Sequence, residues 1–343
     1  MSNGQERTAL AELRARTALR AAGLDPSAPL ERASSVTNEV WLTPSHVVRV
    51  NRSHDNRLAR EAMLARALPD AVGYPRIIAR GGRPGEDWLV AQRVPGSPLA
   101  HCWPDLSQPE RQHAIQQLAA RLAALHSTPA PAGLPRVEGA PQLLEVGEAD
   151  PTSHIVEALE RSARLDFVDP LLIQEALDLV LRVGDALDPF TATTLVHGDV
   201  TFENVLWHEG EVTALLDVEW ARPGPADLDL DIVLRCCAYP QLHVGAVHEE
   251  RTRPEDYVQV PDWLAEAYPG LFAFPRPFDR MRIYSIAYDV RDLLAFPPTV
   301  DVTGLSPMHP YHRLARVVQR RSYIDALAND KERPRKRRPR SGS

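Results

Sequence analysis

Three side chains in one short segment could together transfer a phosphoryl group. Asp199 ends the sequence His-Gly-Asp, Asn204 follows five residues later, and Asp217 closes the apolar run Leu215-Leu216-Asp217. Phosphoryl transfer needs a carboxylate beside the attacking hydroxyl and oxygen ligands that hold magnesium on the nucleotide phosphates. The segment offers both kinds of group.

The residues between Asn204 and Asp217 form two short apolar runs around the polar, glycine-containing turn His208-Glu209-Gly210-Glu211. This pattern predicts a small hairpin, which would bring Asn204 and Asp217 together at one end. Magnesium prefers such oxygen donors and takes further oxygens from substrate phosphates. We therefore assign Asn204 and Asp217 to Mg²⁺.

Asp199 and His197 are the candidate catalytic residues. Asp199 would orient the substrate hydroxyl first and accept its proton late, because a loose transition state needs little early proton transfer. His197 would brace the loop through hydrogen bonds to the backbone.

The longer pattern resembles a known family. His-Gly-Asp-x-x-x-x-Asn-Val-Leu, Leu-Leu-Asp-x-Glu-Trp, Gly-Pro and Asp-Leu follow one another over 197–230, and this order resembles the core of the aminoglycoside phosphotransferase and choline kinase superfamily. The resemblance implies an α+β, two-lobed protein-kinase-like fold. It places a small β-rich nucleotide-binding lobe at 1–94, the hinge and a larger, mainly helical catalytic and substrate-binding lobe at 95–330, and a basic tail at 331–343.

The chain departs from the family pattern at a few positions. Pro225 replaces an acidic residue that many members carry after the glycine, and Phe202-Glu203 stands where Pro-Gly is frequent. Neither change removes a chemical group. The resemblance implies that Asp229 anchors structure near the catalytic loop, and a helix N-cap is the alternative interpretation.

The first 94 residues contain candidates for nucleotide binding. The segment 34–41 is predicted to be a small polar turn running into a strand, and it lacks Gly-x-Gly-x-x-Gly. The resemblance places Asn38 near the tip of a phosphate loop. The alternating run 46–50 predicts a strand, and Arg49 stands where the family carries a phosphate-binding lysine. Arginine offers a planar fork instead of a compact ammonium.

Two further elements complete this nucleotide site. The run 57–68 predicts an amphipathic helix, on which Glu61 resembles the acid that pairs with the strand cation. A solvated partner in a helical ion pair is the alternative. The run 88–96 predicts a strand ending in Pro-Gly and resembles the hinge, where Gln92 and Val94 would offer backbone groups to the adenine.

The larger lobe should hold the substrate. The sequence predicts helices over 108–126, within the acidic insert 152–187 and over 278–294, with loops at 128–142 and 296–310. Acidic and aromatic groups suit a cation or a sugar ring, although solvated helix faces would look the same. The candidate substrate-binding residues are Glu203, Glu219, Trp220 and Asp289.

Composition is that of a soluble globular protein, with 44% hydrophobic and 25% charged residues among 343. No apolar run approaches the length of a membrane span, and the first residues lack the order of a secretory signal. We expect a cytoplasmic protein without membrane contact. The three cysteines and scattered histidines show no zinc-ligand spacing, so we predict no zinc.

Charge is distributed unevenly. The net charge is −7, but 331–340 carries seven cations and one anion, so the rest of the chain carries −13. An acidic body favours a cationic substrate. The basic tail is typical of a solvated end, and we expect no specific nucleic-acid partner.

Taken together, these features predict a small-molecule kinase that uses Mg²⁺ and ATP (or GTP). The leading hypothesis is an O-phosphotransferase acting on a hydroxylated, cationic antibiotic and conferring resistance. A metabolic kinase for an amino alcohol, a sugar or a glycated amine is the alternative, since the same core serves such substrates. A non-catalytic nucleotide-binding module is a third possibility, which the joint presence of Asp199, Asn204 and Asp217 disfavours.

Overall fold

The computed structural model describes residues 2–33, 35, 38–83, 85–138 and 143–332. Contacts divide the chain into two compact units, Met1–Pro141 with Thr191–Phe272, and Gln142–Phe190 with Ala273–Ser343. The predicted lobe boundary at residue 94 lies inside the first unit. The first two residues of the predicted basic tail at 331–343 end a helix, and those from 333 onward lie outside the described residues. No helix in the described part of the chain combines the length and apolarity needed to cross a membrane.

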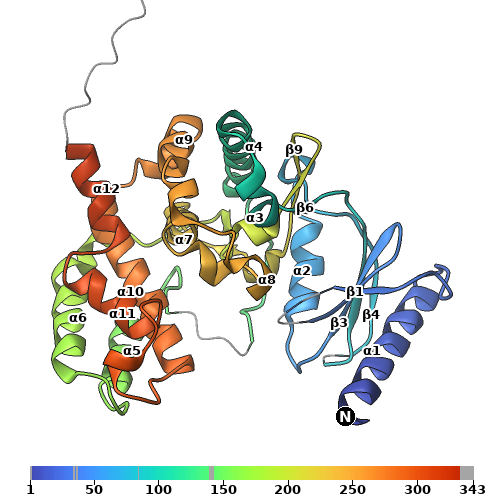
Figure 1. Ribbon diagram of the computed structural model, residues 1–343, viewed down its shortest axis with the longest axis horizontal. Helices are drawn as coiled ribbons and strands as arrows, with labels where there is room; N and C mark the ends of the chain where they lie inside the picture. Colours follow the sequence, from blue (N-terminus) through green and yellow to red (C-terminus); the bar gives the residue numbers. More distant parts are fainter. Residues whose placement is uncertain (1, 34, 36–37, 84, 139–142, 333–343) are drawn as a thin grey trace, which may run out of the picture. The chain divides into compact units, whose positions relative to one another are not determined.

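The first unit begins with a helix and a five-stranded antiparallel sheet in the order β1-β2-β3-β5-β4 (Figure 1). The strands are short, and valine and tryptophan recur in the central ones, β2, β3 and β5. The predicted strands at 46–50 and 88–96 are β3 and β5. The elements are α1 (Ser2–Ala21), β1 (Glu31–Ala33), β2 (Asn38–Leu42), β3 (His46–Asn51), α2 (Arg57–Ala65), β4 (Ile77–Gly81) and β5 (Trp88–Gln92).

The two faces of this sheet pack against different helices. Alternation along β3 puts Val48 and Val50 on the face covered by the alanine-rich side of α1. Leu89 and Ala91 of β5 lie on the opposite face, against Leu58 and Ala62 of α2. Arg49 pairs across the ladder with Leu89. Its side chain therefore points toward α2.

The second part of the first unit contains the segment with the candidate catalytic residues. Its elements are β6 (Ser97–Pro98), α3 (Leu99–Cys102), α4 (Gln108–His126), β7 (Leu195–Val196), η4 (Phe202–Asn204), β8 (Val205–His208), β9 (Glu211–Leu215), η5 (Val218–Trp220), β10 (Arg222–Pro223), α7 (Asp227–Ala238), α8 (Ala246–Glu249) and α9 (Val260–Ala267). The predicted helix at 108–126 is α4, and its stripe of Ile115, Leu118, Leu122 and Leu125 is fully buried.

The predicted hairpin is confirmed as β8 and β9, which pair antiparallel. Glu209 and Gly210 at its tip have φ of 48° and 88°. Two successive residues with positive φ are what a tight hairpin turn with the twist of its strands requires.

The second unit is helical in its described part. The insert contains α5 (Ser153–Ser162) and α6 (Pro170–Val183), and the chain returns as α10 (Pro277–Ala295), η9 (Val302–Gly304), α11 (Pro310–Val318) and α12 (Tyr323–Glu332). Helix α10 contacts α5, α6, α11 and α12. The predicted helix at 278–294 is thus the centre of this unit.

Arg60 on α2 ties the sheet region to the segment after β9. Its guanidinium donates to the carbonyl oxygens of Glu219 (2.7 Å), Ala221 (2.9 Å) and Pro135 (2.7 Å). The residue is 2% exposed, so no bulk water replaces these bonds. Arg60 therefore fixes α2 relative to η5.

We expect Arg60→Ala to lower the free energy of unfolding by about 1–3 kcal/mol, because buried carbonyl oxygens would lose their donors. Urea denaturation of the whole chain measures this. The control is Arg66→Ala at the C-cap of the same helix, an exposed arginine whose removal should change stability by less than about 0.5 kcal/mol. Equal losses in the two variants would contradict this role of Arg60.

Candidate active site

The loop that carries Asp199 is held by one buried carboxylate. Asp229, in the first turn of α7, accepts hydrogen bonds from the backbone N–H groups of His197 (2.6 Å) and Gly198 (2.8 Å). Gly198 has φ of 80°, and a Cβ there would lie 2.7 Å from the carbonyl oxygen of Trp220. Asp229 thus anchors the loop, and it makes no N-cap hydrogen bond at α7, whose N-cap is Ala226.

His126 is a positioning residue that the sequence reasoning treated only as the end of a helix. Its Nε2 lies 2.9 Å from Oδ2 of Asp229, and both side chains are almost fully buried. Burial opposes ionisation of Asp229, but the His126 hydrogen bond and the neighbouring groups outweigh it and hold its pKa below the usual range. A histidine ending an apolar helix upstream of such a loop was the available signal.

His197 braces the loop from inside. Its Nδ1 accepts from the backbone N–H of Asp199 (3.2 Å), and its Nε2 donates to the carbonyl oxygen of Leu216 (2.8 Å). Only the neutral ring can make both bonds, and burial lowers the pKa of His197 accordingly. The ring links the Asp199 loop to the residue before Asp217, so its contacts are those of a positioning residue.

The hairpin brings the two assigned metal ligands to the same end. The backbone N–H of Leu216 donates to the carbonyl oxygen of Asn204 at 2.7 Å, and Asp217 follows with a left-handed backbone, φ 58°. The Asn204 amide nitrogen donates to the backbone oxygen (2.8 Å) and carboxylate (3.1 Å) of Asp199. Because its nitrogen is engaged there, its Oδ1 is the atom left to act as a ligand.

Arg49 lies among three carboxylates. One guanidinium nitrogen lies 2.5 Å from Glu61, and the other lies 3.3 Å from Asp217 and 3.2 Å from Glu219. Burial disfavours its charge, but Glu61 and Asp217 outweigh that effect and raise its pKa. The pairing of Arg49 with Glu61 expected from the sequence is present.

The three acids form a compact oxygen cluster. One carboxylate oxygen each from Glu61, Asp217 and Glu219 lie within 4.8 Å of one another. Burial and then Asp217 raise the pKa of Glu219 to about 8, and burial is the main cause of the raised pKa of Glu61. Arg57 adds a second cation, 3.4 Å from Glu219. Hard oxygen donors at this density suit a magnesium ion.

Tyr74 is a further residue that the sequence reasoning missed. Its hydroxyl donates to the same Glu61 oxygen that pairs with Arg49. Tyr74 follows the glycine that ends a short helical turn, a position with no recognisable pattern. The short turn before it, η1 (Asp70–Val72), packs against α4, and only this tertiary arrangement brings Tyr74 to Glu61.

The remaining nucleotide candidates lie along the sheet. Asn38 is the first residue of β2, is 2% exposed, and pairs with Asn51; Ser34, Val36 and Thr37 of the expected phosphate loop lie outside the described residues. The N–H of Gln92 donates to Arg76, and that of Arg93 to Ser45. These two N–H groups are engaged within the protein, and the nucleotide-binding roles of Asn38, Gln92 and Val94 stay predictions.

The substrate candidates differ in their surroundings. Glu203, beside Asn204, accepts from His101 Nε2 at 2.9 Å, and burial raises its pKa. Glu219 belongs to the Arg49 cluster, and the Trp220 ring lies under Arg57 at 5.5 Å. Asp289, in the second unit, is buried and accepts from Arg313 at 2.8 Å. Their contact with a substrate stays a prediction.

Comparison with known proteins supports the sequence reasoning. A model of the phosphotransferase enzyme family matches residues 29–263. The chain is 32% identical over 169 residues to an aminoglycoside 3'-phosphotransferase of Streptomyces fradiae, covering 48% of this chain and 57% of that protein. It is 26% identical over 207 residues to a viomycin phosphotransferase of Streptomyces vinaceus, covering 57% of this chain and 68% of that protein. The chain thus spans just over half the length of the first of these relatives.

A solved structure shares the fold. A thermostable mutant of an aminoglycoside phosphotransferase, in a ternary complex with ADP and hygromycin B, superposes with a TM-score of 0.58 at 15% identity. The match covers 89% of this chain and 97% of that one. The predicted kinase-like α+β fold, β-rich first and mainly helical later, is confirmed.

The buried neutral state of His197 has a consequence for stability at acid pH. Its folded pKa lies below the ordinary value of about 6.5, so the unfolded chain takes up a proton there first. The contribution of neutral His197 to the free energy of unfolding is therefore fully present above pH 6.5, and it is lost as the pH falls toward the folded pKa. We expect the free energy of unfolding of His197→Asn to fall less between pH 7 and 5 than that of the parent. Urea denaturation at each pH measures this. A parallel decline in the variant and the parent would refute the assignment.

Proposed function

Because the chain belongs to the phosphotransferase enzyme family, we propose that it transfers the γ-phosphoryl group of ATP (or GTP) to a hydroxyl of a small-molecule antibiotic. The arrangement that carries this proposal is Asp199 held beside Asn204, with Asp217 at the same end of the hairpin. The resemblance inferred from residues 197–230 is confirmed by the family match. An antibiotic as the substrate is supported by the activities for which the two relatives are named.

Asp199 is the group that would meet the acceptor hydroxyl. The Asn204 amide fixes its carboxylate, and the loop that bears it is fixed by Asp229 and His197. A carboxylate held in one place orients the hydroxyl for in-line attack and then takes its proton. The rigidity of the loop is therefore part of the chemistry.

The donor set fits a magnesium ion. Asn204 Oδ1 and the Asp217 carboxylate would hold it, and Glu61 and Glu219 lie close to Asp217. A bound magnesium ion neutralises charge on the nucleotide phosphates and orients them. Arg49, which is paired with Glu61, lies next to Asp217 with a planar fork suited to a phosphate oxygen.

The charge of the chain supports a cationic acceptor. Outside the basic run 331–340 the net charge is −13. An acidic surface raises the local concentration of a polyamine-like substrate and speeds its association. We therefore propose a hydroxylated antibiotic that bears amino groups.

The test is a magnesium-dependent screen of nucleotide consumption by the purified chain against aminoglycosides, cyclic-peptide and nucleoside antibiotics, and common amino alcohols and sugars. We expect an antibiotic to stimulate turnover and Asp199→Ala to lower kcat by about 10²–10⁴-fold, because the group that accepts the proton is lost. Glu266→Ala, which removes an exposed acid on α9 outside the acidic insert, is the control. Turnover stimulated only by amino alcohols or sugars would favour the metabolic kinase, and nucleotide binding without turnover would favour the binding module.

The metal assignment has its own test. Asp217→Ala should weaken nucleotide binding about tenfold or more when magnesium is present, a change of about 1.4 kcal/mol. With EDTA in place of magnesium, the variant should bind nucleotide no more weakly than the parent, since no metal then needs the carboxylate and one negative charge near the phosphates is gone. Calorimetric titration measures both conditions. Unchanged magnesium-dependent affinity would show that Asp217 is not a ligand.

A further inference from the structure

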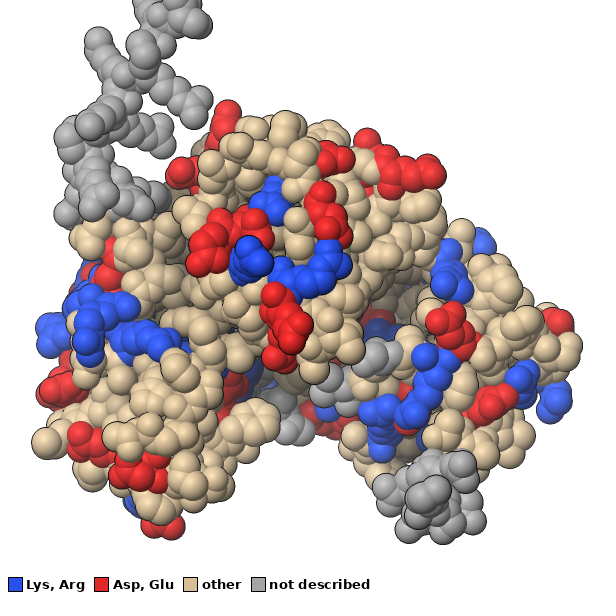
Figure 2. Space-filling model, in the orientation of Figure 1, with Lys and Arg blue, Asp and Glu red and all other residues tan. Residues whose placement is uncertain are grey.

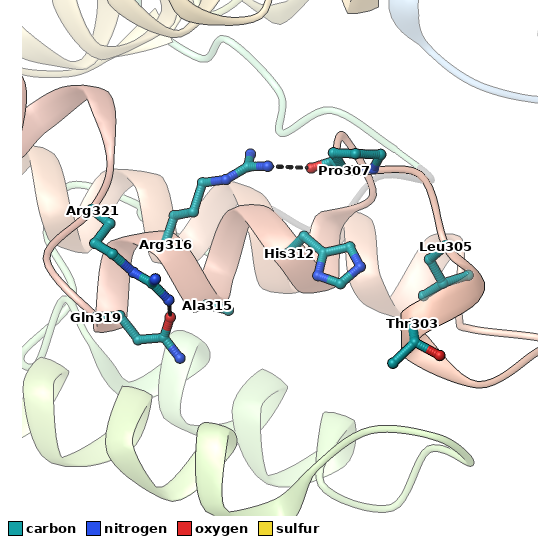
Figure 3. A pocket seen from close by; sticks show the side chains of 8 residues that line it. All are labelled: Thr303, Leu305, Pro307, His312, Ala315, Arg316, Gln319 and Arg321. Carbon is teal, nitrogen blue, oxygen red and sulfur yellow. Dashed lines mark hydrogen bonds between the residues drawn. The ribbon is translucent and has the colours of Figure 1, made fainter.

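Arginine side chains at the surface of this protein are commonly engaged by neighbouring groups. Basic side chains lie beside acidic ones over much of the face drawn in Figure 2. In the pocket of about 460 Å³ beside α11 (Figure 3), Arg316 donates to the carbonyl oxygen of Pro307 at 2.8 Å, and Arg321 donates to Gln319. The buried guanidinium of Arg49 is held in a different way, which leaves part of it toward the proposed nucleotide site.

Arg49 and Glu61 meet end-on. Nη1 of Arg49 lies 2.5 Å from Oε1 of Glu61. Nε of Arg49 and Oε2 of Glu61 are both buried, and neither has a hydrogen-bond partner among the described residues. A side-on fork would instead pair two guanidinium nitrogens with both carboxylate oxygens, the arrangement that arginine and a carboxylate favour. A neighbouring group must therefore keep this pair from closing.

Tyr74 occupies the oxygen that the pair uses. Its hydroxyl donates to Oε1 of Glu61, the same atom that accepts from Arg49. Burial raises the pKa of Tyr74 far above its ordinary value, and the charge of Glu61 raises it further, so the hydroxyl stays protonated and remains a donor. The Tyr74 bond thus holds the carboxylate of Glu61 in one orientation, with Oε2 turned away from the guanidinium.

The second terminal nitrogen of Arg49 points toward the metal side of the site. Nη2 lies 3.3 Å from Oδ1 of Asp217 and 3.2 Å from Oε2 of Glu219. Because Nη1 alone contacts Glu61, Nη2 is left at the hairpin end where the nucleotide phosphates are proposed to lie. A guanidinium nitrogen in this place is suited to donate to a phosphate oxygen.

The position of Tyr74 is set by structure outside α2. The turn η1 before it packs against α4. Arg121 of α4 donates to the carbonyl oxygen of Val72, the last residue of that turn, at 3.2 Å. The Tyr74 hydroxyl is therefore anchored independently of Arg49 and Glu61, as a group that orients them must be.

We propose that Tyr74 is a positioning residue that keeps the Arg49–Glu61 pair end-on and so leaves one guanidinium nitrogen of Arg49 for a phosphate of the bound nucleotide. The inference rests on the proposed function, because the phosphate is that of the phosphoryl donor. Without the hydroxyl, Glu61 would turn both oxygens to the guanidinium and draw the second nitrogen away from the phosphate. A lysine, which has a single nitrogen, would need no such device.

Calorimetric titration of the full chain with a non-hydrolysable ATP analogue and magnesium tests the proposal. We expect Tyr74→Phe to weaken analogue binding about tenfold, because the charge-assisted bond from Arg49 to the phosphate is lost. In an Arg49→Lys background the same change should alter the affinity by less than about twofold, since the two positions are then uncoupled. A general loosening of the fold would weaken binding equally in both backgrounds.

The matched control is Tyr311→Phe, which removes the hydroxyl of a buried tyrosine in the second unit and should leave analogue binding unchanged. Tyr74→Leu, which also lacks the hydroxyl, should repeat the loss seen in Tyr74→Phe. Thermal unfolding checks that each variant is folded. Parent-like affinity in the folded Tyr74 variants, or equal losses in both Arg49 backgrounds, would overturn the positioning role and leave the proposed phosphoryl transfer intact. Failure of the parent to bind the analogue would instead overturn the proposed function itself.

Discussion

The candidate active site depends on the burial of one carboxylate, Asp229. A fully buried carboxylate is stable only when charged or polar donors surround it. Here the donors are two N–H groups of the loop before Asp199, together with His126 at the end of α4. The requirement to satisfy Asp229 therefore fixes the loop, and the loop fixes Asp199. His197, bonded on both ring nitrogens, extends the same constraint to the hairpin end that carries Asp217.

A second constraint is the group of charges around Arg49, in the proposed nucleotide site. Removing a single partner from a buried ionic cluster leaves the others uncompensated, which costs more than the pair itself contributes. Arg49 therefore belongs with Glu61, Asp217 and Glu219 as a unit. A lysine at this position could not span the same acids with a planar fork. The family resemblance implied a lysine where this chain has Arg49. The structure shows that the arginine is accommodated without loss of the pairing to Glu61.

Much of this arrangement could be predicted because it is local. The helix 108–126, the strand beginning at His46 and the hairpin after Asn204 were predicted from periodicity and turn residues, and the structure has all three. Asn38 was expected near the tip of a loop, but it begins a strand and is buried, since a polar turn does not show where pairing starts. Tyr74 was not predicted because it lies in no pattern of its own, and His126 was not predicted because the end of a helix does not show which buried group its side chain meets.

The sequence by itself determined the chemistry available: one loop with Asp199, two oxygen donors at a hairpin end, and a cation on a strand with an acid on the following helix. These depend on spacings of a few residues, over which backbone geometry decides position. Only the tertiary structure decided that Arg49 meets Asp217, 168 residues later, and that Asp229 meets His126. Such contacts follow from burying apolar faces against one another, and the sequence gives no local signal of which faces meet.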